Sequence, residues 1–159
     1  MISDKGYSAF FEIAARMFPH CLIVMTDSAY NIIQKNKESV SDPYLNTIIQ
    51  RGYYDKNDMD SIARHGYFEG ELKYSRPVLY SPEVTVSGKY YMVRSYRKAG
   101  ATLSFAGCYF LDKDPSELDY LMYKCFTDYL YLFMENYVQI ETEWPKYHQR
   151  LITDLVTTE

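Results

Sequence analysis

Hydrophobic and polar residues recur with a helical period between Asp114 and Ile140. The charged residues fall on one narrow stripe there, and apolar residues cover the rest of the predicted helix. Asp114 is placed to cap this helix, Pro115 suits its first turn, and Glu117 is placed to complete a capping box. A helix that rests on one sheet needs only one apolar face. The pattern therefore predicts a second neighbour for this helix.

We expect the second neighbour to be another copy of the chain, because a monomer would have to expose a large apolar patch. The residues expected at the homodimer interface are Leu118, Met122, Phe126, Leu130, Phe133 and Tyr137. The alternative is that the helix is buried within the core of a monomer.

Further helices are predicted in the first half of the chain. Apolar residues at helical spacing over residues 7–18 predict an amphipathic helix that Pro19 ends. Short connector helices are predicted to begin at Asp42-Pro43 and near Asp55, with Gly52 and Gly66 placed to end them.

The β-favouring segments predict hairpins. The strands expected from these segments are Cys21–Met25, Ile32–Gln34, Leu72–Tyr74, Val78–Tyr80, Lys89–Arg97 and Thr102–Leu111. The last two flank a loop, Lys98 to Ala101, in which Gly100 readily adopts positive φ. They should form the central antiparallel pair.

Strands enclosed by helices, without regular alternation of strand and helix, indicate an α+β domain with one antiparallel sheet of about five strands. We expect the N- and C-terminal helices on one face and the connectors Pro43 to Gly66 on the other. A small ligand would fit between the sheet and the connectors.

Composition narrows the classes of function. The chain has 159 residues, of which 47% are hydrophobic and 24% charged, and this indicates one globular domain. Its net charge of −4 argues against direct binding to nucleic acid. The 18 tyrosines supply both packing area and hydroxyl groups for a polar ligand or an interface; compositional drift is the alternative explanation.

The cysteines and histidines predict neither a metal site nor an enzyme. Cys21, Cys108 and Cys125 are far apart and lie among apolar residues, so we expect three free thiols in a cytoplasmic protein. His20 precedes Cys21 directly, and strand neighbours point to opposite faces, so the two are unsuited to act together. No phosphate-binding glycine loop, nucleophile motif, cofactor motif, signal peptide or membrane span is recognisable.

Binding is therefore the expected activity. Alternation places Arg94 with Tyr90 and Tyr96 on one face of its strand, but leaves open which face meets the long helix. If that face looks at the connectors, Arg94 would bind an anionic group. The candidate ligand-binding residues are Arg94, Tyr90, Tyr96, Tyr67 and Phe105. In the alternative, the space is filled by the side chains of Tyr67, Phe68, Tyr91 and Phe105, and the domain only dimerises.

The segment Leu22 to Asp27, followed by a turn, Ile32-Ile33 and Asn36, resembles the opening hairpin of PAS-type sensor domains. Gly88 and the hairpin that leads into the long helix are similar to the last strands of PAS and GAF domains. After Trp144-Pro145, residues 151–156 look like the beginning of a connector helix.

The whole layout is similar to the N-terminal sensor segment of bacterial transcription regulators of the purine-catabolism and sugar-diacid type (PucR- and CdaR-like). The resemblance implies a PAS/GAF-like sensor domain over residues 1–141 and the start of a connector helix over residues 142–159. It also implies an unidentified small-molecule ligand, signalling through the long helix, and contact with DNA only through a further C-terminal domain.

Overall fold

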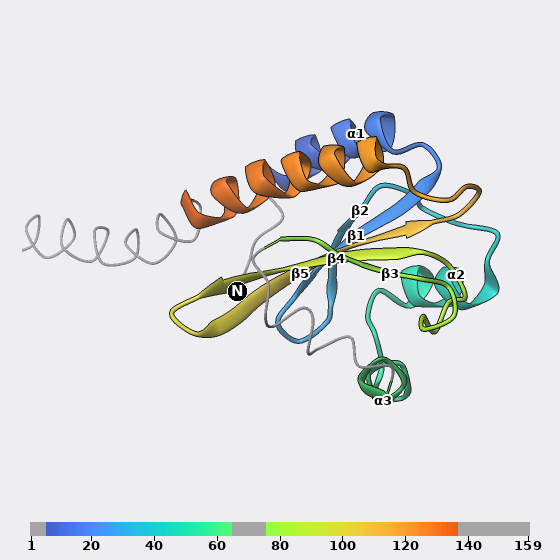
Figure 1. Cartoon of the computed structure of the whole chain (residues 1–159). Helices are drawn as coiled ribbons and strands as arrows, with labels where there is room; N and C mark the ends of the chain where they lie inside the picture. Colours follow the sequence, from blue (N-terminus) through green and yellow to red (C-terminus); the bar gives the residue numbers. More distant parts are fainter. Residues whose placement is uncertain (1–5, 65–75, 137–159) are drawn as a thin grey trace, which may run out of the picture. The chain divides into compact units, whose positions relative to one another are not determined.

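The computed structural model describes residues 6–64 and 76–136. Its five-stranded sheet has the order β2-β1-β5-β4-β3, and every neighbouring pair is antiparallel (Figure 1). The strands are β1 (Cys21–Asp27), β2 (Ile32–Lys35), β3 (Val78–Tyr80), β4 (Tyr91–Lys98) and β5 (Ala101–Phe110). The predicted α+β fold with a single antiparallel sheet, in a PAS/GAF-like arrangement, is confirmed.

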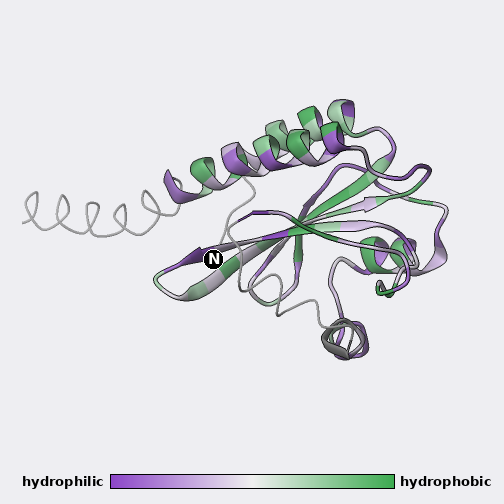
Figure 2. Cartoon of the chain, viewed as in Figure 1, coloured by the Kyte–Doolittle hydropathy of each residue, from purple (hydrophilic) through white to green (hydrophobic). Residues whose placement is uncertain are grey.

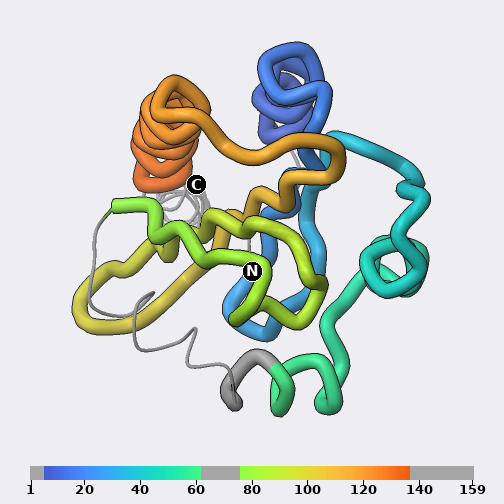
Figure 3. Tube along the Cα trace, turned by 45° about the vertical axis from the view of Figure 1, so that its right-hand side comes forward, coloured from blue at the N-terminus to red at the C-terminus, as the bar shows by residue number. Residues whose placement is uncertain are grey.

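Three helices precede the central hairpin: α1 (Tyr7–Met17), α2 (Pro43–Arg51) and α3 (Lys56–Arg64). A fourth helix, here called the C-terminal helix, covers residues 117–136 of the described part. The chain divides into two compact units, Met1–Thr127 and Asp128–Glu159. Within the first unit, α1 and the start of the C-terminal helix lie side by side on one side of the sheet, whereas α2 and α3 lie on the other (Figure 3).

The two faces of the sheet bury different sets of residues. On the face toward α2, buried residues of β1, β4 and β5 pack with residues of α2 in one apolar cluster. Its members are Leu22, Val24, Tyr91, Val93, Tyr109, Leu45 and Ile49. We call this face the connector side. The alternate residues of the same strands, among them Ile23, Met25, Met92, Ala106 and Cys108, are buried on the other face, the helix side. Because both faces are covered, β1 is apolar from Cys21 to Met25 (Figure 2).

The predicted opening hairpin owes its geometry to two polar side chains. Asp27 Oδ1 accepts hydrogen bonds from the backbone N–H groups of Ala29 and Asn31, at 2.9 Å each, and so shapes the turn after β1. Asn36 Oδ1 accepts from Ile23 N at 2.7 Å, and Asn36 Nδ2 donates to Cys21 O at 3.0 Å. Asn36 therefore holds the end of this hairpin against β1.

The turn between β4 and β5 is a second confirmed prediction. Ala99 and Gly100 have φ values of 54° and 80°. Positive φ at both central residues belongs to the two-residue turns whose twist matches that of the flanking strands.

The connector helices begin and end at the predicted residues as far as they are described. Asp42 Oδ1 accepts from Leu45 N at 2.9 Å, and Gly52 ends α2 in the left-handed conformation with φ of 87°. Asp55 and Asp58 cap α3 reciprocally, since Asp58 N donates to Asp55 Oδ1 at 2.8 Å and Asp55 N to Asp58 Oδ2 at 2.9 Å.

The predicted start of the C-terminal helix requires correction. The capping box consists of Ser116 and Asp119, not of Asp114 and Glu117: Asp119 N donates to Ser116 Oγ at 3.1 Å, and Ser116 N donates to Asp119 Oδ2 at 2.8 Å. A serine hydroxyl three residues before a carboxylate satisfies both N–H groups reciprocally, so helical geometry begins two residues later than predicted, at Glu117.

Several predictions lie outside the described residues. They concern the strand Leu72–Tyr74, the helix end at Gly66, the domain boundary between residues 141 and 142, and the side chains of Tyr67, Phe68 and Tyr137.

Candidate functional site

Tyrosine rings cluster on the connector side of the sheet. The rings of Tyr91 and Tyr109, which are paired across β4 and β5, stack with their centroids 4.4 Å apart and their planes inclined by 23°. The Tyr109 hydroxyl lies 2.8 Å from that of Tyr54, in a buried hydrogen bond. We call Tyr54, Tyr91 and Tyr109 the tyrosine cluster. Beside it, Tyr30 stacks on Phe105 with centroids 5.1 Å apart.

A glycine makes room for this cluster. A Cβ atom on Gly107 of β5 would lie 2.6 Å from the Tyr91 hydroxyl oxygen and 2.7 Å from its Cε2. The Tyr91 ring therefore lies directly over the Gly107 backbone. Glycine inside a strand often marks such a close approach.

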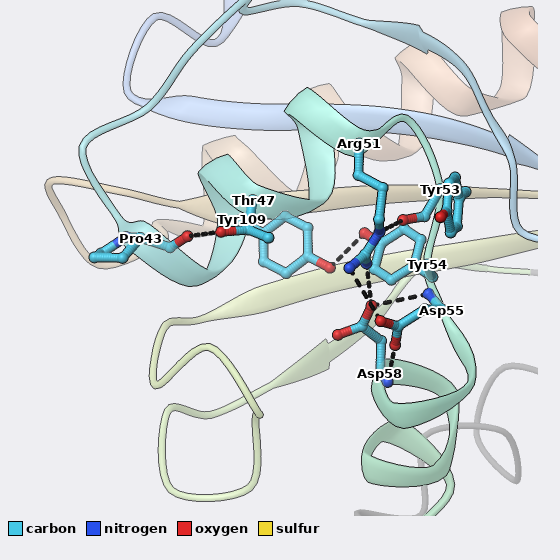
Figure 4. A network of polar contacts seen from close by, with 8 residues as sticks. All are labelled: Pro43, Thr47, Arg51, Tyr53, Tyr54, Asp55, Asp58 and Tyr109. Carbon is cyan, nitrogen blue, oxygen red and sulfur yellow. Dashed lines mark hydrogen bonds and ion pairs between the residues drawn. The ribbon is translucent and has the colours of Figure 1, made fainter.

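An ion-pair network places Tyr54. Arg51, the last residue of α2, reaches the two carboxylates at the start of α3 (Figure 4): its Nη1 lies 3.0 Å from Asp55 Oδ2, and its Nη2 pairs with Asp58. Arg51 Nε also donates to Tyr53 O at 3.0 Å. Because Tyr54 follows Tyr53 directly, the network fixes the backbone that carries its phenol.

The pKa values of Tyr109, in the tyrosine cluster, and of Asp55, in the ion-pair network, are shifted in opposite directions. Burial raises the pKa of Tyr109 well above its usual value, and the neighbouring phenols of Tyr54 and Tyr91 raise it further. The pKa of Asp55 is lowered, chiefly because its carboxylate accepts a hydrogen bond from the Asp58 N–H. At neutral pH the Tyr109 phenol is therefore uncharged, and the tyrosine cluster offers flat rings and hydroxyl groups.

Arg94 lies on the helix side of the sheet, where its Nη1 donates to Thr127 Oγ1 at 2.9 Å and to Lys124 O at 3.3 Å. Its predicted role as a ligand-binding cation beneath the connectors does not fit this placement. The physical reason is the alternation of the strand, because Tyr91 and Val93 occupy the connector side and leave Arg94 to the opposite face.

The other predicted ligand residues are separated in the same way. Tyr96 pairs with Ser104 on the helix side, whereas Phe105 lies beside Tyr30 on the connector side. Tyr90 precedes β4 and is half-buried, and Tyr67 lies outside the described residues. Of the four candidates within the described residues, Phe105 lies on the same face of β5 as Tyr109, whereas Arg94 and Tyr96 lie on the helix side.

The predicted interface residues of the C-terminal helix divide by exposure. Leu118 is 64% exposed and Met122 and Phe133 are half-buried, but Phe126 and Leu130 are buried within the chain, at 5% and 0%. Phe126 packs edge-on against Phe11 and Phe18. Buried side chains have no surface to offer a second copy, so these two do not fit the predicted interface.

A different set of apolar residues faces outward. Leu121, Tyr129 and Leu132 are 55%, 68% and 56% exposed, and Cys125 is an exposed free thiol. We call the set Leu118, Leu121, Cys125, Tyr129 and Leu132 the exposed stripe.

The other two cysteines, Cys21 and Cys108, are buried free thiols on the helix side, and burial raises the pKa of Cys108 well above its usual value.

Within the described residues, none of the helices is both long enough and apolar enough to cross a membrane.

The sequence prediction did not single out Tyr54 and Tyr109. Among 18 tyrosines nothing local distinguishes them. One signal was available: Gly107 interrupts an otherwise strongly β-favouring strand, and such a glycine indicates close packing by a large neighbour.

The chain matches no protein-family model and no curated protein. Among solved structures it is similar to a chain in the crystal structure of the E. coli DhaR(N)-DhaL complex, with a TM-score of 0.54 and 12% sequence identity. The similarity covers 93% of this chain and 51% of the other, so this chain spans about half the length of that one. At this identity the likeness concerns the fold alone.

Proposed function

We propose that this chain is a small-molecule-sensing regulatory domain of a bacterial transcription regulator, without enzymatic activity, which signals through its C-terminal helix. The support comes from the PAS/GAF-like strand order and from the opening hairpin shaped by Asp27 and Asn36. Contact with DNA would be made by a further domain.

The single observation that carries the proposal is that the central strands β4 and β5 join two surfaces. Tyr91 and Tyr109 face the connectors, and the same two strands present Arg94 and Ala106 to the C-terminal helix. A ligand that moves the tyrosine cluster would therefore act on strands that directly contact this helix.

Hydrogen bonds link the sheet to the start of that helix. The Tyr123 hydroxyl donates to Ala106 O at 2.6 Å, and the Tyr120 hydroxyl donates to Pro77 O at 2.9 Å. Arg94 adds its bonds to Lys124 O and Thr127 Oγ1. Two successive turns of the helix, residues 120–123 and 124–127, are therefore hydrogen-bonded to the sheet or to Pro77, which directly precedes β3.

The chemistry of the tyrosine cluster suggests the class of ligand. Stacked rings favour a flat partner, and neutral phenols both donate and accept hydrogen bonds. A planar, uncharged heterocycle with polar edges fits both properties. We propose the connector side, around Tyr54, Tyr91 and Tyr109, as the binding side.

A thermal-shift screen of planar heterocycles tests the binding proposal, because a ligand that binds only the folded state stabilises it by RT ln(1 + [L]/Kd). A compound that stabilises the full chain should bind Tyr109→Phe at least about tenfold more weakly, a loss of about 1.4 kcal/mol. Tyr53→Phe, an exposed neighbour, is the matched control and should bind normally. Equal affinity of the two variants would place the ligand elsewhere.

A second candidate function is a dimerisation module without a ligand. It is favoured by the position of the Tyr91 ring, which fills the space over Gly107 and belongs to the same apolar cluster as Leu45 and Ile49. If no compound from a broad metabolite collection stabilises the chain, whereas sedimentation shows a dimer, this second candidate is supported.

A further inference from the structure

The exposed stripe has a symmetric arrangement. Successive members are separated by three, four, four and three positions, from Leu118 to Leu132, with Cys125 in the middle. At 3.6 residues per turn these five positions fall within an arc of about 80° on one face of the helix. The stripe lies opposite the buried positions Tyr123 and Thr127.

Symmetry of this kind makes the stripe complementary to itself in the antiparallel direction. If two copies of the helix cross at Cys125, Leu118 meets the partner's Leu132, Leu121 meets the partner's Tyr129, and Cys125 meets its own counterpart. An isologous interface requires that each contact between two positions occur twice, related by the two-fold axis. All five exposed apolar side chains satisfy this requirement at once.

We propose that two copies of this chain pair through the exposed stripe in the antiparallel direction, with Cys125 on the two-fold axis. The inference rests on the homodimer that the sequence predicts and that the second candidate function also requires, and it adds the face, the direction and the register of that dimer. The occupant of the stripe is thus a second copy of the chain.

The flanks of the stripe favour the same direction. One flank carries Glu117, Lys124, Asp128 and Glu135, and the other carries the half-buried Met122 and Phe133. In an antiparallel pair the two-fold axis brings each flank beside the same flank of the partner, so polar residues meet polar ones and apolar residues meet apolar ones. In a parallel pair, the charged flank would lie against the partner's Met122 and Phe133.

In this register the charges nearest the crossing point have opposite signs, whereas at each end of the flank Glu117 lies beside the partner's Glu135, which carries the same charge. Lys124 lies one residue before the two-fold position and Asp128 three residues after it. At 1.5 Å rise per residue, Lys124 and the partner's Asp128 are offset by only about 3 Å along the helix axis. The two symmetric pairs of opposite charge would lie beside the crossing point, where solvent-exposed pairs add specificity more than affinity.

Disulfide cross-linking of the full chain tests the direction. Copper phenanthroline in air oxidises two adjacent thiols to a disulfide, and the two electrons and two protons pass to oxygen. The starting protein is Cys125→Ser, into which Leu118→Cys and Leu132→Cys are introduced separately. The two variants carry tags of different size and are tested alone and as a mixture after exchange of subunits.

We expect the mixture to form a disulfide between positions 118 and 132, identified by mass spectrometry of the linked peptides, at least tenfold more than either variant alone. Unmodified protein should cross-link through Cys125, and Cys125→Ser should not. Glu38→Cys in the Cys125→Ser protein is the control for random collision, since this side chain is 91% exposed and lies off the helix.

Each other outcome has a distinct meaning. Efficient cross-linking of Leu118→Cys and of Leu132→Cys alone would show a parallel pair, which overturns the inference and leaves the homodimer intact. A dimer in sedimentation without cross-links above the Glu38→Cys control would show that another face is used, which also overturns it. A monomer at all concentrations would overturn both the inference and the homodimer.

Discussion

Tyr91 and Gly107 illustrate how closely single residues are matched on the connector side. The phenol ring of Tyr91, on β4, lies over two residues of the neighbouring strand β5: it contacts the backbone of Gly107 and stacks on the ring of Tyr109. The size of the residue at position 107 therefore controls the position of a ring in the proposed binding side.

Gly107→Ala should destabilise the domain by about 1–3 kcal/mol, the usual cost of an extra methyl group in a packed interior. The cause is the contact of the new Cβ with Tyr91, so Tyr91→Ala should cost less in the Gly107→Ala protein than in the unmodified one. Urea unfolding of the four proteins of this cycle measures the coupling. Additive effects would show that the Tyr91 ring moves aside freely.

Arg94 contributes on the opposite face. Its hydrogen bond to Thr127 Oγ1 joins β4 to the C-terminal helix, and both groups are at least half-buried. Arg94→Met and Thr127→Val should each lower the free energy of unfolding by about 1–2 kcal/mol, because each removes a hydrogen bond to a charged group. Their effects should be less than additive by about 1 kcal/mol.

Arg97→Met is the matched control for that cycle, since Arg97 is exposed on the same strand and donates a hydrogen bond to Gly100 O, in the adjacent turn, at 3.1 Å. It should show no coupling to Thr127→Val. If it couples as strongly as Arg94→Met, the effect is a property of strand charge and not of the Arg94–Thr127 contact.

At the scale of elements, the start of the C-terminal helix depends on one reciprocal cap. Burial opposes ionisation of Asp119, but hydrogen bonds from Ser116 N and Ser116 Oγ, together with the charge of Lys113, outweigh it and lower the pKa of the carboxyl from its usual value of 3.8. A lowered carboxyl pKa stabilises the fold above the unfolded value and loses that contribution as the pH falls through the folded one.

Ser116→Ala should therefore cost about 1 kcal/mol at pH 7, as is usual for loss of an N-cap, and the difference from the unmodified protein should shrink below pH 4. Urea unfolding at pH 7 and at pH 3.5 measures both numbers. Ser28→Ala, in the exposed turn after β1, is the control and should show no pH-dependent difference. A cost that stays constant with pH would separate the serine from the ionisation of Asp119.

At the scale of the whole molecule, the exposed stripe predicts association. Sedimentation at micromolar concentration should show a homodimer, because burying apolar side chains of this size is favourable by roughly 25 cal/mol per Å². Leu121→Glu should raise the dissociation constant at least about tenfold, that is, by 1.4 kcal/mol or more, since it places a carboxylate within an apolar contact.

Leu79→Glu is the matched control, because Leu79 is an exposed leucine of β3 and lies off the stripe. It should leave the association unchanged. Equal weakening by both substitutions would indicate that net charge, and not the exposed stripe, governs association.

Local patterns in the sequence were sufficient to predict most elements of this protein. Asp42, Pro43 and Gly52 delimit α2. Asp27 and Asn36 shape the first hairpin, and Ala99-Gly100 forms the turn of the last one. Each of these residues acts on backbone groups that are only a few residues away or on the adjacent strand. The α+β class followed from their order. The surplus of apolar residues on the C-terminal helix was also readable, since it depends only on the helical period.

Tertiary structure alone decided which residues share a surface. A strand of period two presents the same alternation whichever face meets the connectors, so the sequence could not place Arg94, and only the packing of Tyr91 and Val93 against α2 turned it toward Thr127. The same holds for the C-terminal helix, where contact with Phe11 and Phe18 buries Phe126 and leaves Leu121 outside. Period and capping are properties of one segment, whereas the direction of a face is a property of what packs against it.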